Sequence, residues 1–212
     1  MNFPDFHQFP KHIVVAGCFA LAGCGGGGGS DSGGSGGGTP TTTFADVDSA
    51  STTLFDTYID ASGDPISGVT VTDASAFPSG SVTYEGYIRG EYQSETLIGS
   101  VSLTSAFASD TISGSASDFY HETSGAVSGS LTGDGNINTS ATGAIPQVTV
   151  NLDGTLGIDG VATDTALALD GDFLTLGTNE ADAIGGQVEG TLTATGAGAV
   201  AFTDGVFVAV QD

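Results

Sequence analysis

The 212-residue chain carries 25 Asp and Glu against two Lys and Arg, for a net charge of −23. Such a surface repels phosphate, which excludes nucleic acid as a partner. Roughly 170 residues follow the glycine-rich segment near the N-terminus, which is the length of one domain of ordinary size. We interpret the acidity as a source of solubility in a salty medium, with recruitment of a cationic partner as the alternative.

The first 23 residues have the layout of a secretory signal peptide, with Lys11 ahead of a short apolar run. That run is shorter than the roughly 20 apolar residues that cross a membrane. The segment Leu21-Ala22-Gly23-Cys24 resembles the lipobox of bacterial lipoproteins, which are cut before a cysteine that is then acylated with diacylglycerol. Cys18 ends a similar segment, but little apolar sequence precedes it, so Cys24 is the expected lipidation site. An ordinary signal peptide with an incidental cysteine is the alternative.

Residues 24–39 are almost entirely glycine and serine after the cysteine, a composition typical of a flexible tether. Lipoprotein sorting rules imply the outer membrane, because Gly25 rather than an aspartate follows Cys24. Residues 40–79 are expected to be a transitional segment that packs on the main domain. Within it, residues 54–59 are predicted as a short strand or helical turn, and residues 67–72 as a short strand.

From residue 80 to residue 212 the chain alternates apolar and polar residues between turn signals, which predicts strands. The eight predicted runs are residues 81–92, 97–107, 111–119, 126–135, 147–158, 165–176, 183–194 and 199–210. Each has a glycine near its middle: Gly86, Gly99, Gly114, Gly129, Gly154, Gly171, Gly190 and Gly205. Glycine permits the sharp coiling of strands in a small barrel, and closure removes exposed sheet edges. The sequence therefore predicts an all-β fold, an eight-stranded antiparallel up-and-down β-barrel with a disordered lipidated N-terminal tether.

One face of each run is apolar and is expected to fill the barrel. These residues are Leu97, Val101, Leu103, Val127, Leu131, Val148, Val150, Leu152, Leu156, Ile158, Leu167, Leu169, Phe173, Ile184, Val188, Leu192, Phe202, Val206 and Val208. A barrel that spans the outer membrane would show the reverse pattern, with aromatic girdles at both rims. We therefore expect a soluble barrel with a filled interior.

Several motifs in this region resemble the barrel domain of transferrin-binding protein B and its relatives. They are "GSVTYEGYIRG" at 80–90, "LIGSVSLTSAFASDTISGSASDF" at 97–119, "GSLTGDGNI" at 129–137, "GDFLTLGTNEADAIGGQVEGT" at 171–191 and "DGVFVAVQD" at 204–212. The resemblance covers about residues 78–212. It implies an eight-stranded barrel on a surface lipoprotein, in a family of which many members bind host proteins or iron sources.

The chain departs from the two-lobed members of that family. It has one barrel, too few residues before it for a full handle domain, and no match to a transferrin-binding loop. It is similar instead to the short single-barrel relatives described as transferrin-binding protein-like solute-binding proteins. The resemblance therefore implies the fold and the surface display, and leaves the ligand open.

His121 is the only histidine after the predicted signal peptide. Asp118, His121 and Glu122 could hold a metal, but three candidate ligands in one turn are a weak signal, and we favour an exposed polar turn. No nucleophile–base pair stands out, so we expect neither an enzyme nor a cofactor nor a metal.

The Asp-Gly pairs lack the spacing of an EF-hand. We interpret 134–135, 153–154 and 159–160 as hairpin turns, which Asp-Gly favours. Gly185-Gly186 is read as a bulge or turn rather than a phosphate loop, because no helix follows it.

The expected function is that of an outer-membrane-anchored, surface-exposed lipoprotein of a Gram-negative bacterium. Its barrel would bind an extracellular protein or a solute, such as an iron carrier, through loops at the rim. The chain is expected to be a monomer that contacts membrane lipid through acylated Cys24. The alternative is a periplasm-facing structural lipoprotein or a carrier, which would need a cavity inside the barrel.

Tyr and Arg dominate binding hot spots, which selects the candidate ligand-binding residues. They are Tyr84, Tyr87, Arg89, Tyr92, Phe119 and Tyr120. For each tyrosine the alternative role is packing at a barrel end. For Arg89 the alternative is a structural ion pair, with Glu91 as the expected partner.

Overall fold

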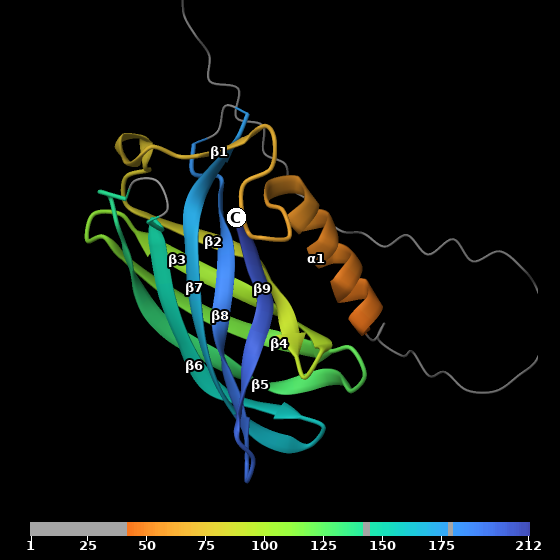
Figure 1. The fold of residues 1–212 in the computed structure, drawn as a ribbon. Helices are drawn as coiled ribbons and strands as arrows, with labels where there is room; N and C mark the ends of the chain where they lie inside the picture. Colours follow the sequence, from red (N-terminus) through yellow and green to blue (C-terminus); the bar gives the residue numbers. More distant parts are fainter. Residues whose placement is uncertain (1–41, 142–144, 178–179) are drawn as a thin grey trace, which may run out of the picture. The chain divides into compact units, whose positions relative to one another are not determined.

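The computed structural model describes residues 42–141, 145–177 and 180–212. The predicted signal peptide, Cys24 and the tether lie outside these residues. The elements run in the order α1 (Phe44–Tyr58), β1 (Val69–Val71), η1 (Ala74–Ala76), β2 (Ser81–Tyr92), β3 (Glu95–Ala106), β4 (Thr111–His121), β5 (Gly125–Ile137), β6 (Val148–Ile158), β7 (Val161–Leu176), β8 (Ala183–Ala194) and β9 (Ala199–Gln211) (Figure 1).

Strands β2 to β9 form a closed antiparallel barrel in which each strand pairs with its neighbour in the sequence. Closure occurs between β9 and β2, with Tyr87 opposite Val208. The predicted eight-stranded up-and-down barrel is confirmed. The predicted bounds 81–92 and 183–194 coincide with β2 and β8, and the other strands differ from their predicted bounds by a few residues.

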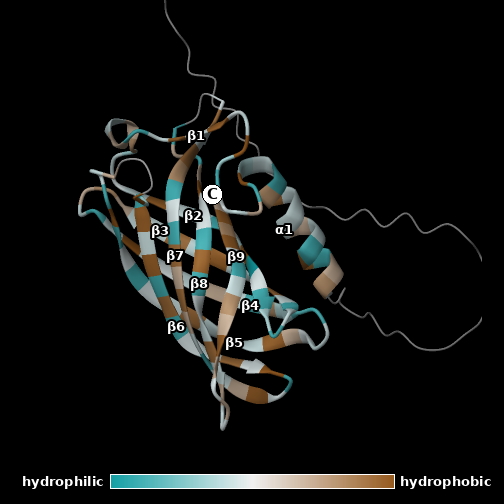
Figure 2. Ribbon diagram, in the orientation of Figure 1, coloured by the Kyte–Doolittle hydropathy of each residue, from teal (hydrophilic) through white to brown (hydrophobic). Residues whose placement is uncertain are grey.

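The interior of the barrel is filled by the apolar positions of the alternating pattern, which Figure 2 shows as brown and pale bands along each strand. Leu103, Leu131, Leu152 and Leu169 are fully buried in one continuous cluster. An aromatic group closes one end of this cluster, with ring centroids 4.7 Å apart for Phe77 and Phe173, and 5.1 Å apart for Phe107 and Phe173. Large side chains thus occupy the interior along the barrel.

Two of the strand glycines mark places where a side chain has no room. A Cβ on Gly86 would lie 2.0 Å from the carbonyl oxygen of Val208 on β9, where the barrel closes. A Cβ on Gly99 would lie 2.4 Å from the ring of Phe119, which fills the space inside the sheet. Close approach of backbone and ring is therefore a physical reason for glycine in these two strands.

Val206 and Val208 were predicted to point into the barrel, and this prediction is wrong. A bulge at Asp204, where φ is +50°, shifts the register of β9 against both neighbouring strands. A bulge adds one residue and so reverses which side chains point inward. Phe207 and Ala209 consequently belong to the interior cluster, whereas Val206 and Val208 pack in a second cluster on the outer wall.

Helix α1 covers this second cluster. Thr43 begins the helix as its N-cap and forms a capping box with Asp46. Val47, Ser51, Phe55 and Tyr58 are the buried residues, and their spacing of three or four places them on one stripe. Of the two alternatives predicted for residues 54–59, the helical turn is correct and the short strand is wrong: these residues are the end of a longer helix. The helix forms because its apolar stripe packs on the outer wall of the barrel.

The two ends of the barrel differ. At one end, here called the hairpin end, short connections join β2 to β3, β4 to β5, β6 to β7 and β8 to β9. The opposite end, here called the loop end, carries the connections 107–110, 138–147 and 177–182, together with β1 and η1. Among the predicted Asp-Gly turns, only 159–160 connects two strands. The pairs 134–135 and 153–154 lie inside β5 and β6, where both neighbouring strands pair with them.

At the loop end, β1 pairs with the last three residues of β7, Leu174 to Leu176. These residues extend past Gly171, which pairs with the first residue of β6. Gln147 fixes this arrangement: its Nε2 donates to the carbonyl of Thr72 at 2.8 Å, and its Oε1 accepts the N–H of Phe173 at 3.0 Å.

Within the described ranges, no helix has the length and apolar character needed to cross a membrane.

Candidate functional site

Three of the six predicted ligand-binding residues, Tyr84, Tyr92 and Phe119, lie inside the barrel. The hydroxyl of Tyr84 donates to the carbonyl of Ala181 at 3.0 Å, and the ring is fully buried. Burial raises the pKa of Tyr84, and the negative charge of Asp182 raises it further. The geometry favours the packing alternative for these three residues, because at most 4% of the surface of each is exposed to a ligand.

The other three residues lie on the outer wall. Tyr87 is half-buried against the cluster under α1. Arg89 forms an ion pair with Asp48 of α1, with Nη1 and Oδ1 3.0 Å apart, and donates to Oγ1 of Thr52 at 3.0 Å. The expected partner Glu91 is not involved in this ion pair, because the helix supplies a nearer carboxylate.

Tyr120 is half-buried and lies opposite Ile98 on β3, which in turn lies opposite Arg89 on β2. Directly opposite residues share a face of the sheet, so Tyr120 is also on the outer wall. The six predicted residues are therefore divided between two sides of the sheet and do not form one site.

His121 is buried at the hairpin end, with 5% of its surface exposed. Its Nδ1 is 2.9 Å from Oγ of Ser124, and its Nε2 lies 3.4 Å from Oε2 of Glu95. Glu122 instead accepts the N–H of Thr96, and Asp118 is exposed at a bulge. Over residues 42–141, 145–177 and 180–212, no three His, Cys, Asp or Glu side chains gather as metal ligands would.

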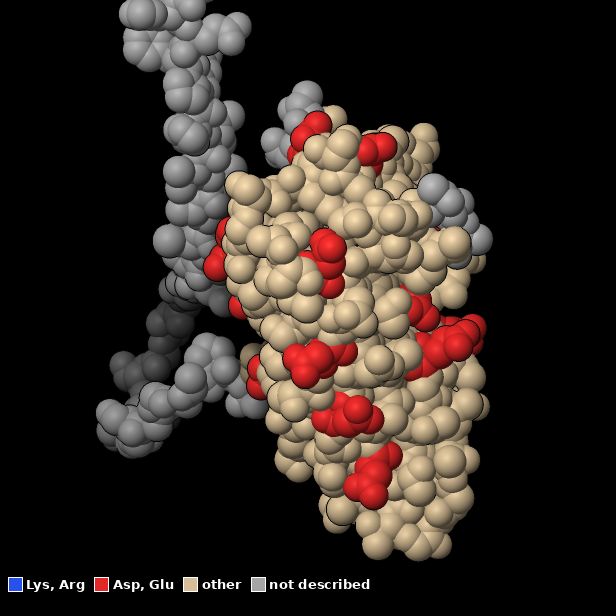
Figure 3. Space-filling view, turned by 90° about the vertical axis from the view of Figure 1, so that its left-hand side faces the viewer, with Lys and Arg blue, Asp and Glu red and all other residues tan. Residues whose placement is uncertain are grey.

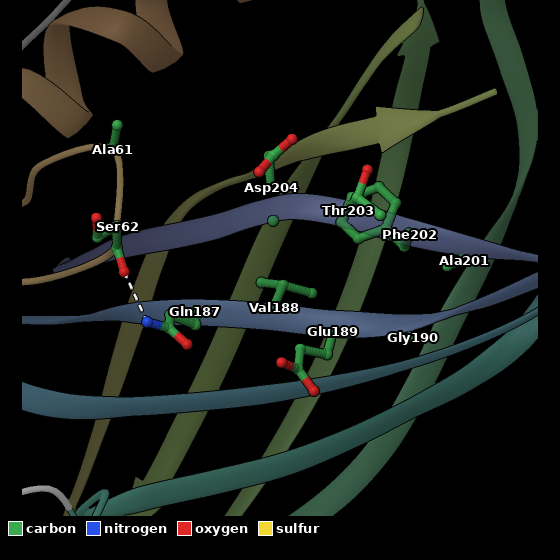
Figure 4. A pocket seen from close by; sticks show the side chains of 11 residues that line it. Ala61, Ser62, Gln187, Val188, Glu189, Gly190, Ala201, Phe202, Thr203 and Asp204 are labelled. Carbon is green, nitrogen blue, oxygen red and sulfur yellow. Dashed lines mark hydrogen bonds between the residues drawn. The ribbon is translucent and has the colours of Figure 1, made fainter. Parts of the chain in front are cut away.

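An open groove crosses the outer wall at the bulge of β9, with a volume of about 570 Å³ (Figure 4). Glu189 on β8 and Asp204 on β9 provide its carboxylates, and Ala61 and Ser62 overhang one side. Nε2 of Gln187 donates to the carbonyl of Ser62 at 2.8 Å and holds the overhanging turn on β8. This groove, here called the bulge groove, offers oxygen acceptors and negative charge.

A second groove lies on the other side of the same turn and is here called the loop-end groove. It has a volume of about 360 Å³. Asp64 in the turn, Asp170 and Asp172 on β7, and the apolar Ile145 and Pro146 line it. The turn approaches the wall closely, because a Cβ on Gly63 would lie 2.8 Å from the backbone of Gly186.

The surroundings of Asp172 act on the pKa of its carboxyl group in opposite directions. Burial raises its pKa, the N–H of Gln147 bound to Oδ1 at 3.0 Å lowers it, and the charge of Asp64 raises it. The net shift is upward. Ionised Asp172 is therefore destabilised by partial burial and by a like charge, and a cation in the loop-end groove would offset both.

The rest of the outer wall is also negative. Figure 3 shows separate Asp and Glu side chains on one face and no Lys or Arg. Lys11 and Arg89 are the only Lys and Arg in the sequence, and Arg89 is paired with Asp48. The described surface is thus suited to cationic rather than anionic ligands.

Comparison with protein-family models, with curated proteins and with solved structures finds no match to this chain. The two grooves were not predicted from the sequence, because they depend on where the turn at 60–65 packs. The prediction of a bulge or turn at Gly185-Gly186 is wrong, because both residues lie inside β8 and pair in register with β7 and β9. Their lack of side chains instead lets the backbone at Gly63 approach the wall.

Proposed function

We propose that this protein is a lipoprotein of the outer membrane, displayed on the cell surface, whose barrel binds an extracellular protein or a solute such as an iron carrier. Support comes from the order of features along the chain. A lipobox-like segment ending in Cys24 precedes a glycine-rich tether, and the tether precedes a closed barrel. This order fits a barrel that is attached to a membrane at Cys24 through a glycine-rich segment.

The filled interior of the barrel is the observation that favours surface recognition over the carrier alternative. A carrier barrel leaves room for a ligand among its inward-facing side chains. Here Phe173, Phe207 and Leu152 are fully buried within the interior cluster. Binding is therefore expected on the outer wall and the loop end.

Lipid anchoring is tested by comparing Cys24→Ser with Cys18→Ser in intact cells. Cys18→Ser is the matched control, since it ends the second lipobox-like segment. We expect Cys24→Ser to release the protein from the membrane fraction and to abolish incorporation of labelled palmitate, and Cys18→Ser to leave both unchanged. Membrane association and labelling that survive in Cys24→Ser would overturn the anchoring proposal.

A further inference from the structure

The loop end of the barrel lies opposite the place where the chain enters the described structure. Asp48, in the first half of α1, contacts Arg89 near the hairpin end of β2, whereas Phe55 and Tyr58 pack with Leu174 and Val69 near the loop end. Helix α1 therefore runs from the hairpin end toward the loop end. Thr42, the first described residue, therefore lies nearer the hairpin end than the loop end.

Exposed apolar side chains gather at the loop end. Of the four large apolar residues that are exposed in the described part of the chain, three are at this end: Val71, Ile145 and Leu176. Val71 and Leu176 share one face of the β1–β7 pair, and Ile145, 53% exposed, lines the loop-end groove. Of these three residues only Ile145 lines the loop-end groove, where an exposed apolar group within a polar rim is typical of an interaction surface.

The charges around this surface are all of one sign. Asp64, Asp170 and Asp172 line the loop-end groove. Among the described residues Arg89 is the one Lys or Arg, and it is already paired with Asp48 of α1. Asp172 is additionally destabilised by the charge of Asp64. Complementary charge would relieve this repulsion, and an apolar side chain would cover Ile145.

From these contacts we propose that the loop-end groove docks a cationic segment of a partner polypeptide, in which an apolar residue inserts beside Ile145 and flanking Lys or Arg side chains pair with Asp64, Asp170 and Asp172. The inference rests on the proposed function and specifies the chemistry of the partner. It differs from general attraction to an acidic surface, because it requires both the apolar contact and these particular carboxylates.

The test measures fluorescence anisotropy of a labelled peptide, in which two leucines are flanked by lysines, against the full chain purified in detergent. A second peptide has serines in place of the leucines. We expect the leucine peptide to bind, the serine peptide to bind more weakly, and the double variant Asp170→Asn/Asp172→Asn to weaken binding of the leucine peptide about tenfold. Ile145→Ser should remove the difference between the two peptides.

The matched control is Asp153→Asn/Asp164→Asn, which removes the same charge from exposed positions on β6 and β7. We expect this control to bind like the parent chain. An equal loss in the control, equal binding of the two peptides, or no binding at all would overturn the docking proposal. The readout is independent of where the protein resides, so release or protection of the protein in cells tests the proposed function separately.

Discussion

Nη1 of Arg89 lies 3.0 Å from Oδ1 of Asp48, so the one arginine in the sequence holds helix α1 to the barrel wall. The side chains are 33% and 37% exposed, and Oδ1 of Asp48 has no donor with hydrogen-bond alignment. The contact is thus a partly solvated ion pair, supplemented by the bond from Arg89 to Thr52.

A double-mutant cycle with Arg89→Met and Asp48→Asn should give a coupling free energy of roughly 0.5–1 kcal/mol, as expected for a pair with this exposure. The measurement is urea unfolding of the two single variants, the double variant and the parent chain. Repeating it in 0.5 M salt should reduce the coupling, because salt screens exposed pairs. A coupling that is indistinguishable from zero at low salt would show that apolar packing alone holds α1.

Gln147→Met should lower the free energy of unfolding by about 2–4 kcal/mol, since it leaves a buried carbonyl at Thr72 and a buried N–H at Phe173 without partners. Gln187→Met is the matched control, because its bond to Ser62 is exposed to water. Gln187→Met should lower the free energy of unfolding by less than about 1 kcal/mol. Similar losses in both variants would contradict the role assigned to Gln147 at the loop end.

Asp172→Asn should stabilise the protein at neutral pH. Burial and Asp64 raise the pKa of Asp172 in the folded state, so the folded protein resists ionisation of this group. Its contribution to stability is therefore favourable at low pH and is lost as the pH rises from its ordinary pKa near 3.8 through the raised value. Asparagine keeps an oxygen that accepts the N–H of Gln147.

The measurement is the difference in unfolding free energy between Asp172→Asn and the parent chain at pH 3 and at pH 7. The unfolding free energy of Asp172→Asn should exceed that of the parent chain at pH 7, and the two should be equal at pH 3. Asp153→Asn is the control for the loss of one negative charge on the outer wall. If the control gains as much as the variant, general charge repulsion rather than the surroundings of Asp172 is responsible.

Gly86→Ala should destabilise the barrel by about 1–3 kcal/mol, because the new methyl group collides with the backbone of Val208 at the closing strand pair. Gly198→Ala is the matched control, since no atom lies within 4 Å of the position of its Cβ. The control should leave the unfolding midpoint unchanged. A Gly86→Ala protein as stable as the control would remove the steric explanation for glycine at this position.

The sequence was sufficient to predict the barrel, because alternation with a period of two and the turn residues report on the strands locally. It was not sufficient for β9. Phe202 and Phe207 both point into the barrel although they are five residues apart, because the bulge at Asp204 lies between them. A bulge is fixed by pairing with both neighbouring strands, which alternation in one strand does not reveal. Tyr84 and Tyr92 each lie four residues from Ile88 in β2, so the alternating pattern places all three side chains on the same face. The burial of both tyrosines could therefore have been predicted from the sequence.

Helix α1 and the grooves were harder to predict. Thr43 and Asp46 form a capping box that was present in the sequence, but the helix is rich in Ser and Thr, and its stability comes from packing on the outer wall. The loop-end groove joins Asp64 to Asp170 and Asp172, more than a hundred positions later, through a turn whose place depends on Gly63 and Gly186. Only the folded chain brings these residues together.

Surface display is tested most directly by protease treatment of intact cells, with a periplasmic protein as the control for leakage. The protease must have broad specificity. Trypsin has one possible site after the predicted signal peptide, Arg89, which is paired within β2, so trypsin serves as the negative control. If the protein is displayed on the cell surface, the broad protease removes the full-length protein while the periplasmic control stays intact. Full protection, with cleavage only after the cells are lysed, would contradict surface display.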